Sequence, residues 1–120
     1  MNSIPEFLKR SVDINPKKTA IITEEQEYTY EEIDEMSSSI AKNLSIYGQN
    51  FVLSMMLDNS IEFIITYLGI IKSGNVAHII PTNISEINLS EQIISTSPKC
   101  IISSEQYLPR LNKLKSNFDI

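Results

Sequence analysis

Strand-length apolar runs alternate with helical patterns along most of this sequence, and that alternation restricts the fold more than any other feature. The clearest run is FVLSMML (51–57), which is apolar at nearly every position. A strand buried on both faces of a parallel sheet has this composition. Similar runs follow at 75–80 (NVAHII), where Pro81 ends the strand, and at 100–103 (CIIS). We expect all three to be buried strands.

A helical pattern lies between the first two of these runs. The segment IEFIITYLGIIKS (61–73) is apolar almost all round. We therefore expect a helix here, capped by Asp58, Asn59 or Ser60, to be the most buried element. Gly74 ends this helix. We expect a left-handed backbone at Gly74, because glycine adopts that conformation without steric penalty.

Two further helices are predicted toward the C-terminus. One covers about 88–96, and the other begins after Ser103 or Ser104. The first turns Leu89, Ile93 and Ile94 inward, and the second has an apolar side of Tyr107, Leu108, Leu111 and Leu114. The final residues, FDI (118–120), are typical of the opening of another strand.

The N-terminal part of the chain predicts a helix followed by two short strands. The segment SIPEFLKRSVDINP (3–16) suits a short helix with Phe7, Leu8 and Val12 on one apolar side. The β-branched TAIIT (19–23) and the YTY that follows it predict strands.

The clearest helix start in the sequence lies at Thr29. Thr29 as N-cap and Glu32 at the third helical position fit a capping box, and acidic residues crowd the first turn, where the helix dipole favours them. The apolar positions at helical spacing are Ile33, Met36, Ile40, Ala41, Leu44 and Tyr47. We expect Gly48 to stop this helix and Ser37 to Ser39 to lie on its polar side.

Strands that alternate with helices predict an α/β fold. The expected architecture is βα-alternating, with a mostly parallel sheet, helices packed on it and right-handed crossovers. No low-complexity linker divides the 120 residues. A chain of this length is one domain or one piece of a larger one.

Charge and targeting patterns exclude several classes of function. The net charge of -5 argues against nucleic acid or an anionic membrane surface as a partner. The N-terminus carries Glu6, Lys9 and Arg10 where a signal peptide needs an apolar run. The longest hydrophobic segment, 63–71, is far short of the ~20 residues that span a bilayer. We expect a cytoplasmic protein.

The residues that could carry chemistry are few. Cys100 is the only cysteine and lies in an apolar run, which favours a small buried side chain over a nucleophile. His78 is the only histidine, and a lone histidine in a strand favours a hydrogen-bonded structural residue, although it lies near the sheet end where ligands bind in α/β folds. No glycine-rich phosphate loop and no metal-ligand spacing is present. We therefore assign no catalytic, cofactor-binding or metal residue.

The segment YTYEEIDEMSSSIAKNLSIYG resembles the opening motif of the adenylate-forming (AMP-binding) superfamily, which includes acyl-CoA synthetases and nonribosomal peptide synthetase adenylation domains. The residues that carry the resemblance are Thr29, Tyr30, Glu32 and Ile33, followed by Ser37, Ala41, Leu44 and Gly48. The stretches NPKKTAIITEEQEYTY, LDNSIEFIITYLGIIKSG and SPKCIISSEQYLPRL are also similar to the family, in the same order. One motif departs, because Ile79 stands where the family has a proline and Pro81 where it has an acid or amide. The resemblance allows Asn83 as the shifted counterpart of that acid or amide.

The resemblance implies that residues 1–120 are the incomplete N-terminal portion of the large domain of an AMP-forming carboxylate ligase. In such a parent, a carboxylate attacks ATP to give an acyl-adenylate, and the acyl group passes to the thiol of coenzyme A or of a carrier protein. ATP and magnesium would serve the parent, whose phosphate loop, adenine motif, ribose-binding Asp and catalytic Lys lie downstream. We expect the segment to be inactive alone, to self-associate and to have the remainder of the parent as its partner.

Two other hypotheses remain open. The chain is a free-standing, non-catalytic α/β module for protein interaction or regulation, or it is an unrelated small α/β domain. An open reading frame after codon 120 with a Ser/Thr/Gly-rich loop and a Lys would favour the ligase, and a stop codon would favour the module.

Overall fold

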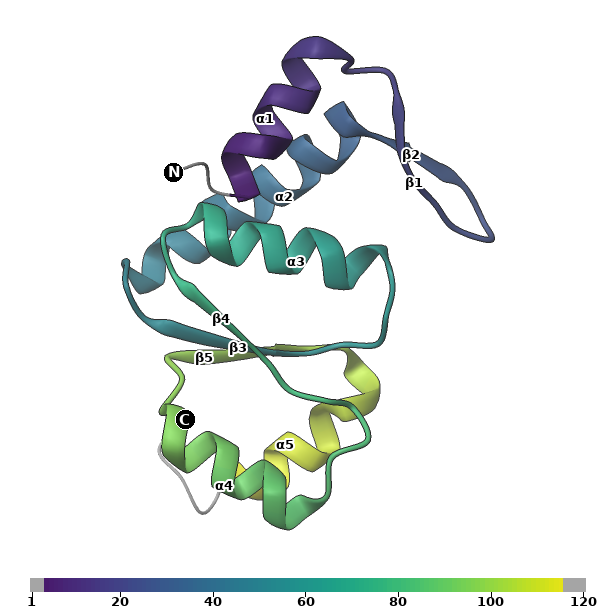
Figure 1. Cartoon of the computed structure of the whole chain (residues 1–120). Coiled ribbons are helices and arrows are strands. Elements are labelled where there is room, and N and C mark those ends of the chain that lie inside the picture. The colour runs from purple at the N-terminus through teal and green to yellow at the C-terminus, as the bar shows by residue number, and fades with distance from the viewer. Residues whose placement is uncertain (1–3, 116–120) are drawn as a thin grey trace.

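The computed structural model describes residues 4–115. Its elements are α1 (Ile4–Ile14), β1 (Thr19–Ile22), β2 (Glu27–Thr29), α2 (Tyr30–Leu44), a 3-10 turn (Ser45–Tyr47), β3 (Val52–Met56), α3 (Ile61–Lys72), β4 (Val76–Ile79), α4 (Glu86–Thr96), β5 (Cys100–Ser103), a second 3-10 turn (Glu105–Tyr107) and α5 (Leu108–Lys115). They stack in layers with helices above and below a central sheet (Figure 1). The strand expected at 118–120 lies outside the described residues.

The central sheet has three parallel strands in the order β4-β3-β5, which confirms the predicted α/β class. Leu53 pairs with Ala77 of β4 on one side and with Cys100 of β5 on the other. β3 is therefore the central strand. Four of its five residues are buried, as the continuous apolar run predicts.

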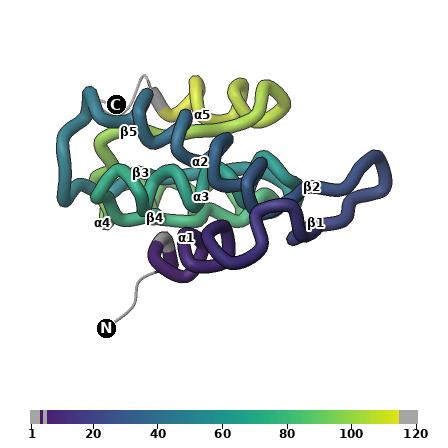
Figure 2. Tube along the Cα trace, turned by 90° about the horizontal axis from the view of Figure 1, so that it is seen from above, coloured from purple at the N-terminus to yellow at the C-terminus, as the bar shows by residue number. Residues whose placement is uncertain are grey.

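The two crossovers of this sheet are right-handed. α3 connects β3 to β4 over one face, and α4 connects β4 to β5 over the other (Figures 1 and 2). α5 lies on the same face as α4. Its Leu111 and Leu114 share a core cluster with Leu89 and Ile93 of α4 and with Met56 of β3.

The N-terminal part packs mainly on α3, but Leu44 of α2 reaches the sheet and shares a core cluster with Leu53 and Met55 of β3. β1 and β2 form an antiparallel hairpin that projects from the molecule (Figure 1). Leu8 of α1, Ile33 of α2 and Leu68 of α3 form a second core. α2 begins as predicted, because Thr29 Oγ1 accepts a hydrogen bond from the Glu32 amide at 3.2 Å and Glu32 Oε1 accepts one from the Thr29 amide at 3.0 Å.

α2 and α3 cross at small residues. Ser37 is fully buried at this crossing, so its assignment to a polar side was wrong. Its hydroxyl donates to the Ile33 carbonyl at 2.8 Å, which satisfies it without a partner from another helix. Gly69 of α3 lies against Ile40 and the Ser37 carbonyl. Because neither Ser37 nor Gly69 carries a large side chain, the two helix backbones approach closely.

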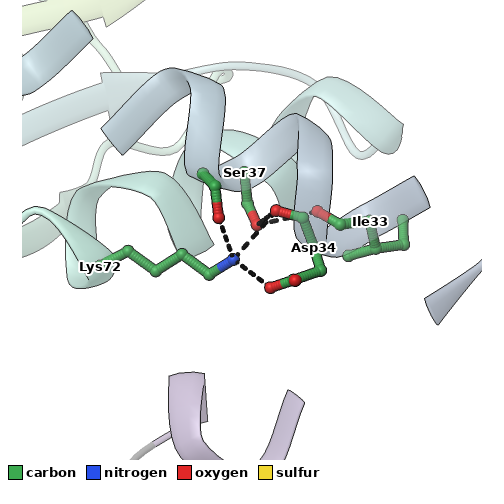
Figure 3. A network of polar contacts seen from close by, with 5 residues as sticks. Ile33, Asp34, Ser37 and Lys72 are labelled. Carbon is green, nitrogen blue, oxygen red and sulfur yellow. Dashed lines mark hydrogen bonds and ion pairs between the residues drawn. The ribbon is translucent and has the colours of Figure 1, made fainter. Parts of the chain in front are cut away.

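A lysine joins the same two helices beside this crossing (Figure 3). Lys72 Nζ lies 2.7 Å from Asp34 Oδ1 and donates to the Asp34 carbonyl at 3.1 Å and to Ser38 Oγ at 3.0 Å. The Lys72 side chain is only 12% exposed. Partial burial makes this ion pair stronger than one on an open surface.

The joint between α3 and β4 is built from glycine and asparagine. Gly74 has a φ of 82°, as predicted. Asn75 is buried, and its side chain accepts from the Phe51 amide at 2.9 Å and donates to the Gly48 carbonyl at 3.0 Å. The turn after α3 is thus tied to the turn before β3, which aligns the amino ends of both strands.

Two burial predictions were wrong. α3 is not the most buried element, because only four of its twelve residues are buried against four of five in β3. β4 and β5 are edge strands rather than buried ones: Val76 and Ile79 of β4 are 58% and 44% exposed, and all four residues of β5 are only half-buried. The apolar composition of such a strand indicates that it belongs to the sheet. It does not indicate that both sides of the strand are buried.

Several side chains and helix ends also differ from expectation. Phe7, Ile94 and Leu108 were expected to face inward, but they are exposed. The regular α2 helix ends at Leu44, and the 3-10 turn carries the chain to Gly48, whose φ is 88°. The cap of α3 is Ser60, and Ser104 precedes the second 3-10 turn without a side-chain capping bond.

Candidate functional site

The carboxyl ends of all three parallel strands lie at one edge of the sheet. The residues that follow them are Leu57 and Asp58 after β3, Ile80 and Pro81 after β4, and Ser104 after β5. Ligands of open α/β sheets bind in crevices outside these ends. This edge is therefore the candidate site.

A cavity of about 530 Å³ opens at this edge between α3 and β5. Its lining residues are Leu57, Asp58, Ser60, Glu62, Thr66, Ile102, Ser103, Ser104 and Gln106. The lining combines carboxylates and hydroxyls with apolar side chains and has no cationic side chain. It is therefore suited to hydrogen-bonding or cationic groups rather than to a polyanion.

Asp58 serves the structure of this edge. Its carboxylate accepts hydrogen bonds from the Tyr107 hydroxyl and, at 3.1 Å, from Gln106 Nε2. Its carbonyl accepts from the Ser60 hydroxyl at 2.9 Å, and Ser60 Oγ in turn accepts from the Phe63 amide at the start of α3. Asp58 thus connects the end of β3 to the turn after β5.

Two hydroxyls at the cavity lack a partner. Ser103 Oγ and Ser104 Oγ are buried and make no hydrogen bond to the described residues. A buried hydroxyl without a partner costs about 1–3 kcal/mol. These two oxygens are the unsatisfied polar atoms nearest the end of β5, and sequence patterns gave no indication of them.

A second, more open hollow of about 860 Å³ runs beside α4. Its lining is Pro81, Asn83, Ile84, Ser85, Asn88, Glu91, Gln92 and Ser95. Arg110 of α5 holds the adjoining loop, donating from Nη1 to the Thr82 carbonyl at 3.2 Å and from Nη2 to the Ile84 carbonyl. Arg110 thus ties α5 to the loop that contains Asn83, which follows the departure from the family motif at Ile79 and Pro81.

His78 and Cys100 lie in strands, away from either hollow's lining. His78 Nδ1 is 2.8 Å from the hydroxyl of the fully buried Ser54, its register partner in β3. This confirms the prediction that His78 is hydrogen-bonded within the sheet. Cys100 is half-buried, and burial raises the pKa of its thiol. The neutral thiol is a poor nucleophile.

The acidic residues at the start of α2 form no site. Glu31 pairs with Lys17 at 3.0 Å and Glu32 caps the helix. Across residues 4–115, no group of three or more His, Cys, Asp or Glu side chains is placed to hold a metal ion. Within the same residues, no helix is long and apolar enough to cross a membrane.

The fold defines an α/β segment of the kind found in adenylate-forming enzymes. The family model for AMP-binding enzymes matches residues 8–119. The chain belongs to the AMP-binding enzyme family.

Its relatives include a surfactin synthase subunit and a CoA ligase. Surfactin synthase subunit 3 of Bacillus subtilis (strain 168) is 24% identical over 102 residues, which cover 83% of this chain and 8% of the relative. The 2-succinylbenzoate–CoA ligase of Bacillus cereus (strain AH820) is 25% identical over 109 residues, covering 89% of this chain and 23% of the relative. The chain thus spans less than a quarter of the length of these curated relatives.

Solved structures share the fold. The anthranilate CoA ligase AuaEII in complex with anthranoyl-AMP has a TM-score of 0.86 at 21% identity, covering 94% of this chain and 22% of that one. The N-terminal domain of FACL13 from Mycobacterium tuberculosis has a TM-score of 0.89 at 21% identity, covering 97% of this chain and 30% of that one. At these identities the likeness establishes architecture alone.

Proposed function

We propose that residues 1–120 are the N-terminal segment of the AMP-binding domain of a carboxylate ligase, and that the ligase activity belongs to a longer parent protein. The observation that carries this proposal is the family match over residues 8–119. The same residues cover only 22% and 30% of the two solved relatives named above. A segment of this kind supplies part of a domain and needs the remainder to complete a site.

The reaction proposed for the parent has two steps. A carboxylate oxygen attacks the α-phosphorus of ATP, so that a new P–O bond forms and pyrophosphate leaves. A thiol then attacks the acyl carbon, a thioester forms, and AMP leaves with the carboxylate oxygen. A relative is named as a CoA ligase, and another structure holds anthranoyl-AMP. Coenzyme A and a carrier-protein thiol are both compatible acceptors.

The described residues do not by themselves fit ATP and magnesium. Phosphoryl chemistry needs cations and oriented amides around the phosphates. The cavity at the sheet edge has Asp58 and Glu62 in its lining and no cationic side chain, and the chain carries a net charge of -5. We therefore assign the nucleotide and magnesium sites to the remainder of the parent.

This proposal is tested with two proteins, the 120-residue chain and the full-length natural protein. Each is assayed for ATP–pyrophosphate exchange with a panel of carboxylic acids, and the 120-residue chain is titrated calorimetrically with Mg-ATP. We expect acid-dependent exchange from the natural protein. Circular dichroism first checks that the 120-residue chain is helical. That chain should then give neither exchange nor micromolar binding of Mg-ATP.

Two outcomes would contradict the proposal. Micromolar nucleotide affinity or exchange above background in the 120-residue chain would show that a complete site lies within it. A natural protein that gives no exchange with any acid would support the alternative, a non-catalytic module for protein interaction or regulation.

A further inference from the structure

The cavity of about 530 Å³ between α3 and β5 takes no part in the reaction proposed for the parent, yet it has the size of a small-molecule site. Such sites are mostly apolar and carry a few polar groups that orient the ligand. Here Leu57 and Ile102 supply apolar wall, and hydroxyls and carboxylates supply the polar groups. The chemistry of those polar groups decides which ligand fits.

Thr66 is the most buried polar residue of this wall. It lies on α3 and is only 5% exposed. A threonine inside a helix commonly donates its hydroxyl proton to the carbonyl three or four residues before it. Among residues 4–115, the Thr66 hydroxyl makes neither that bond nor any other hydrogen bond. It therefore offers the cavity a donor and an acceptor that are both unused.

Ser103 and Ser104 add two more hydroxyls, from β5 and from the turn after it. Both oxygens are buried and have no partner within the described residues. Buried hydroxyls nearly always have a partner in proteins. Because a serine hydroxyl changes direction by rotation about one bond, it can meet a ligand in the cavity without movement of the backbone. Three unpaired hydroxyls from three elements thus line one space.

Glu62 gives the cavity its available charge. It is exposed and lies one helical turn before Thr66, so the two side chains share a face of α3. Its carboxylate forms no hydrogen bond or ion pair to the residues that the structure describes. The Asp58 carboxylate, in contrast, already accepts from Gln106 and Tyr107. Because the described lining has no cationic side chain, Glu62 attracts a cation to the cavity.

We propose that this cavity binds a small organic cation, a primary ammonium group on a short aliphatic chain. An ammonium group has three N–H donors, which suit the Glu62 carboxylate and the oxygens of Thr66 and Ser103. The aliphatic chain lies against Leu57 and Ile102. This site goes beyond the proposed ligase segment, and its test does not measure adenylation.

Titration of the ¹⁵N-labelled 120-residue chain with n-butylammonium chloride, followed by nuclear magnetic resonance, tests the proposal. At pH 7 and constant ionic strength we expect a Kd of about 1–10 mM, as for a ligand of few atoms. The amide signals of Thr66, Ser103 and Ser104 should shift, whereas those of α4 beside the second hollow should not. The isosteres n-butanol and butanoate should each bind at least about 10-fold more weakly, because only the ammonium donates charge-assisted hydrogen bonds.

Two substitutions separate the charge from the hydroxyl. Glu62→Gln should weaken n-butylammonium binding about 5–10-fold. Glu91→Gln removes the same charge from the second hollow and should leave the affinity unchanged. Thr66→Val keeps the shape of the side chain and should weaken binding about 3–10-fold, whereas Thr66→Ser keeps the hydroxyl and should bind within about 3-fold of the unsubstituted chain. Because the lost hydroxyl has no partner, Thr66→Val should not lower the urea midpoint.

Several results would overturn the inference. They are the absence of any shift at the cavity, equal or tighter binding of n-butanol or butanoate, and an affinity that neither Glu62→Gln nor Thr66→Val changes. Saturation-transfer difference spectra of n-butylammonium with the full-length natural protein complete the test, and we expect a signal there that Glu62→Gln reduces. Binding by the 120-residue chain alone would show that the rest of the longer protein fills the cavity, which would also overturn the proposal.

Discussion

Replacement of Gly69 by alanine tests the helix crossing that joins the N-terminal part to the sheet. A Cβ at Gly69 would lie 2.5 Å from Ile40 Cγ2 and 2.8 Å from Ile40 Cβ, and 3.2 Å from the Ser37 carbonyl oxygen. A change of the Ile40 rotamer could move only Cγ2. Its Cβ and the Ser37 carbonyl are fixed to the α2 backbone, so the helices have to separate.

Two opposing effects set the expected magnitude. Alanine is a better helix former than glycine by about 1 kcal/mol in an exposed helix. Overpacking of a tight core costs about 1–3 kcal/mol, and contacts to backbone-fixed atoms belong to the upper part of that range. We therefore expect Gly69→Ala to reduce the free energy of unfolding by about 1–2 kcal/mol.

Urea unfolding of the 120-residue chain, followed by circular dichroism, measures this difference as a shift in midpoint at constant slope. Ser39→Ala, on the exposed side of α2, is the control and should be neutral or slightly stabilising. Adding Ile40→Ala to Gly69→Ala should relieve part of the strain, since it removes Cγ2. A Gly69→Ala variant more stable than the parent would refute the close crossing.

Three further predictions concern the turn, the ion pair and the thiol. Gly74→Val should lower the free energy of unfolding by more than ~1 kcal/mol because φ at this residue is 82°, whereas Gly74→Asn should lower it less. A valine variant that is as stable as the parent in urea unfolding would show that the turn is made elsewhere. A double-mutant cycle of Lys72→Met and Asp34→Asn should give a coupling of about 0.5–3 kcal/mol, and zero coupling would refute the pair. Cys100 should react with iodoacetamide at pH 8 more slowly than free glutathione, because burial raises its pKa above the ordinary 9.0. The same shift means that the folded state keeps this proton to a higher pH than the unfolded state does, so the thiol's contribution to stability is lost as pH rises above 9.0. Alkylation as fast as that of glutathione would show an exposed thiol.

Local chemistry made the successful predictions possible. The capping box at Thr29 and Glu32 is encoded by two residues three positions apart, and it forms as expected. The left-handed Gly74 and the buried run of β3 are likewise properties of short segments. The parallel sheet follows from the order of such segments and the rule of right-handed crossovers.

The failures concern neighbours that are distant in sequence. The hydrophobic period places Ser37 correctly on a helix, but only the approach of Gly69 on α3 determines that this small polar residue is buried. The strand order β4-β3-β5 decides that Val76 lies at an edge. At the candidate site, the unsatisfied hydroxyls of Ser103 and Ser104 depend on the packing of the turn after β5. No sequence motif specifies that packing.

The most direct test of the central claim follows oxygen atoms through the reaction of the full-length natural protein. A substrate acid found by exchange assay is labelled with ¹⁸O in its carboxylate and incubated with Mg-ATP and a thiol acceptor. If the protein is an AMP-forming ligase, the released AMP carries one ¹⁸O, because the carboxylate oxygen that attacked the α-phosphorus stays with it. Unlabelled AMP, or label in inorganic phosphate instead, would contradict the assignment.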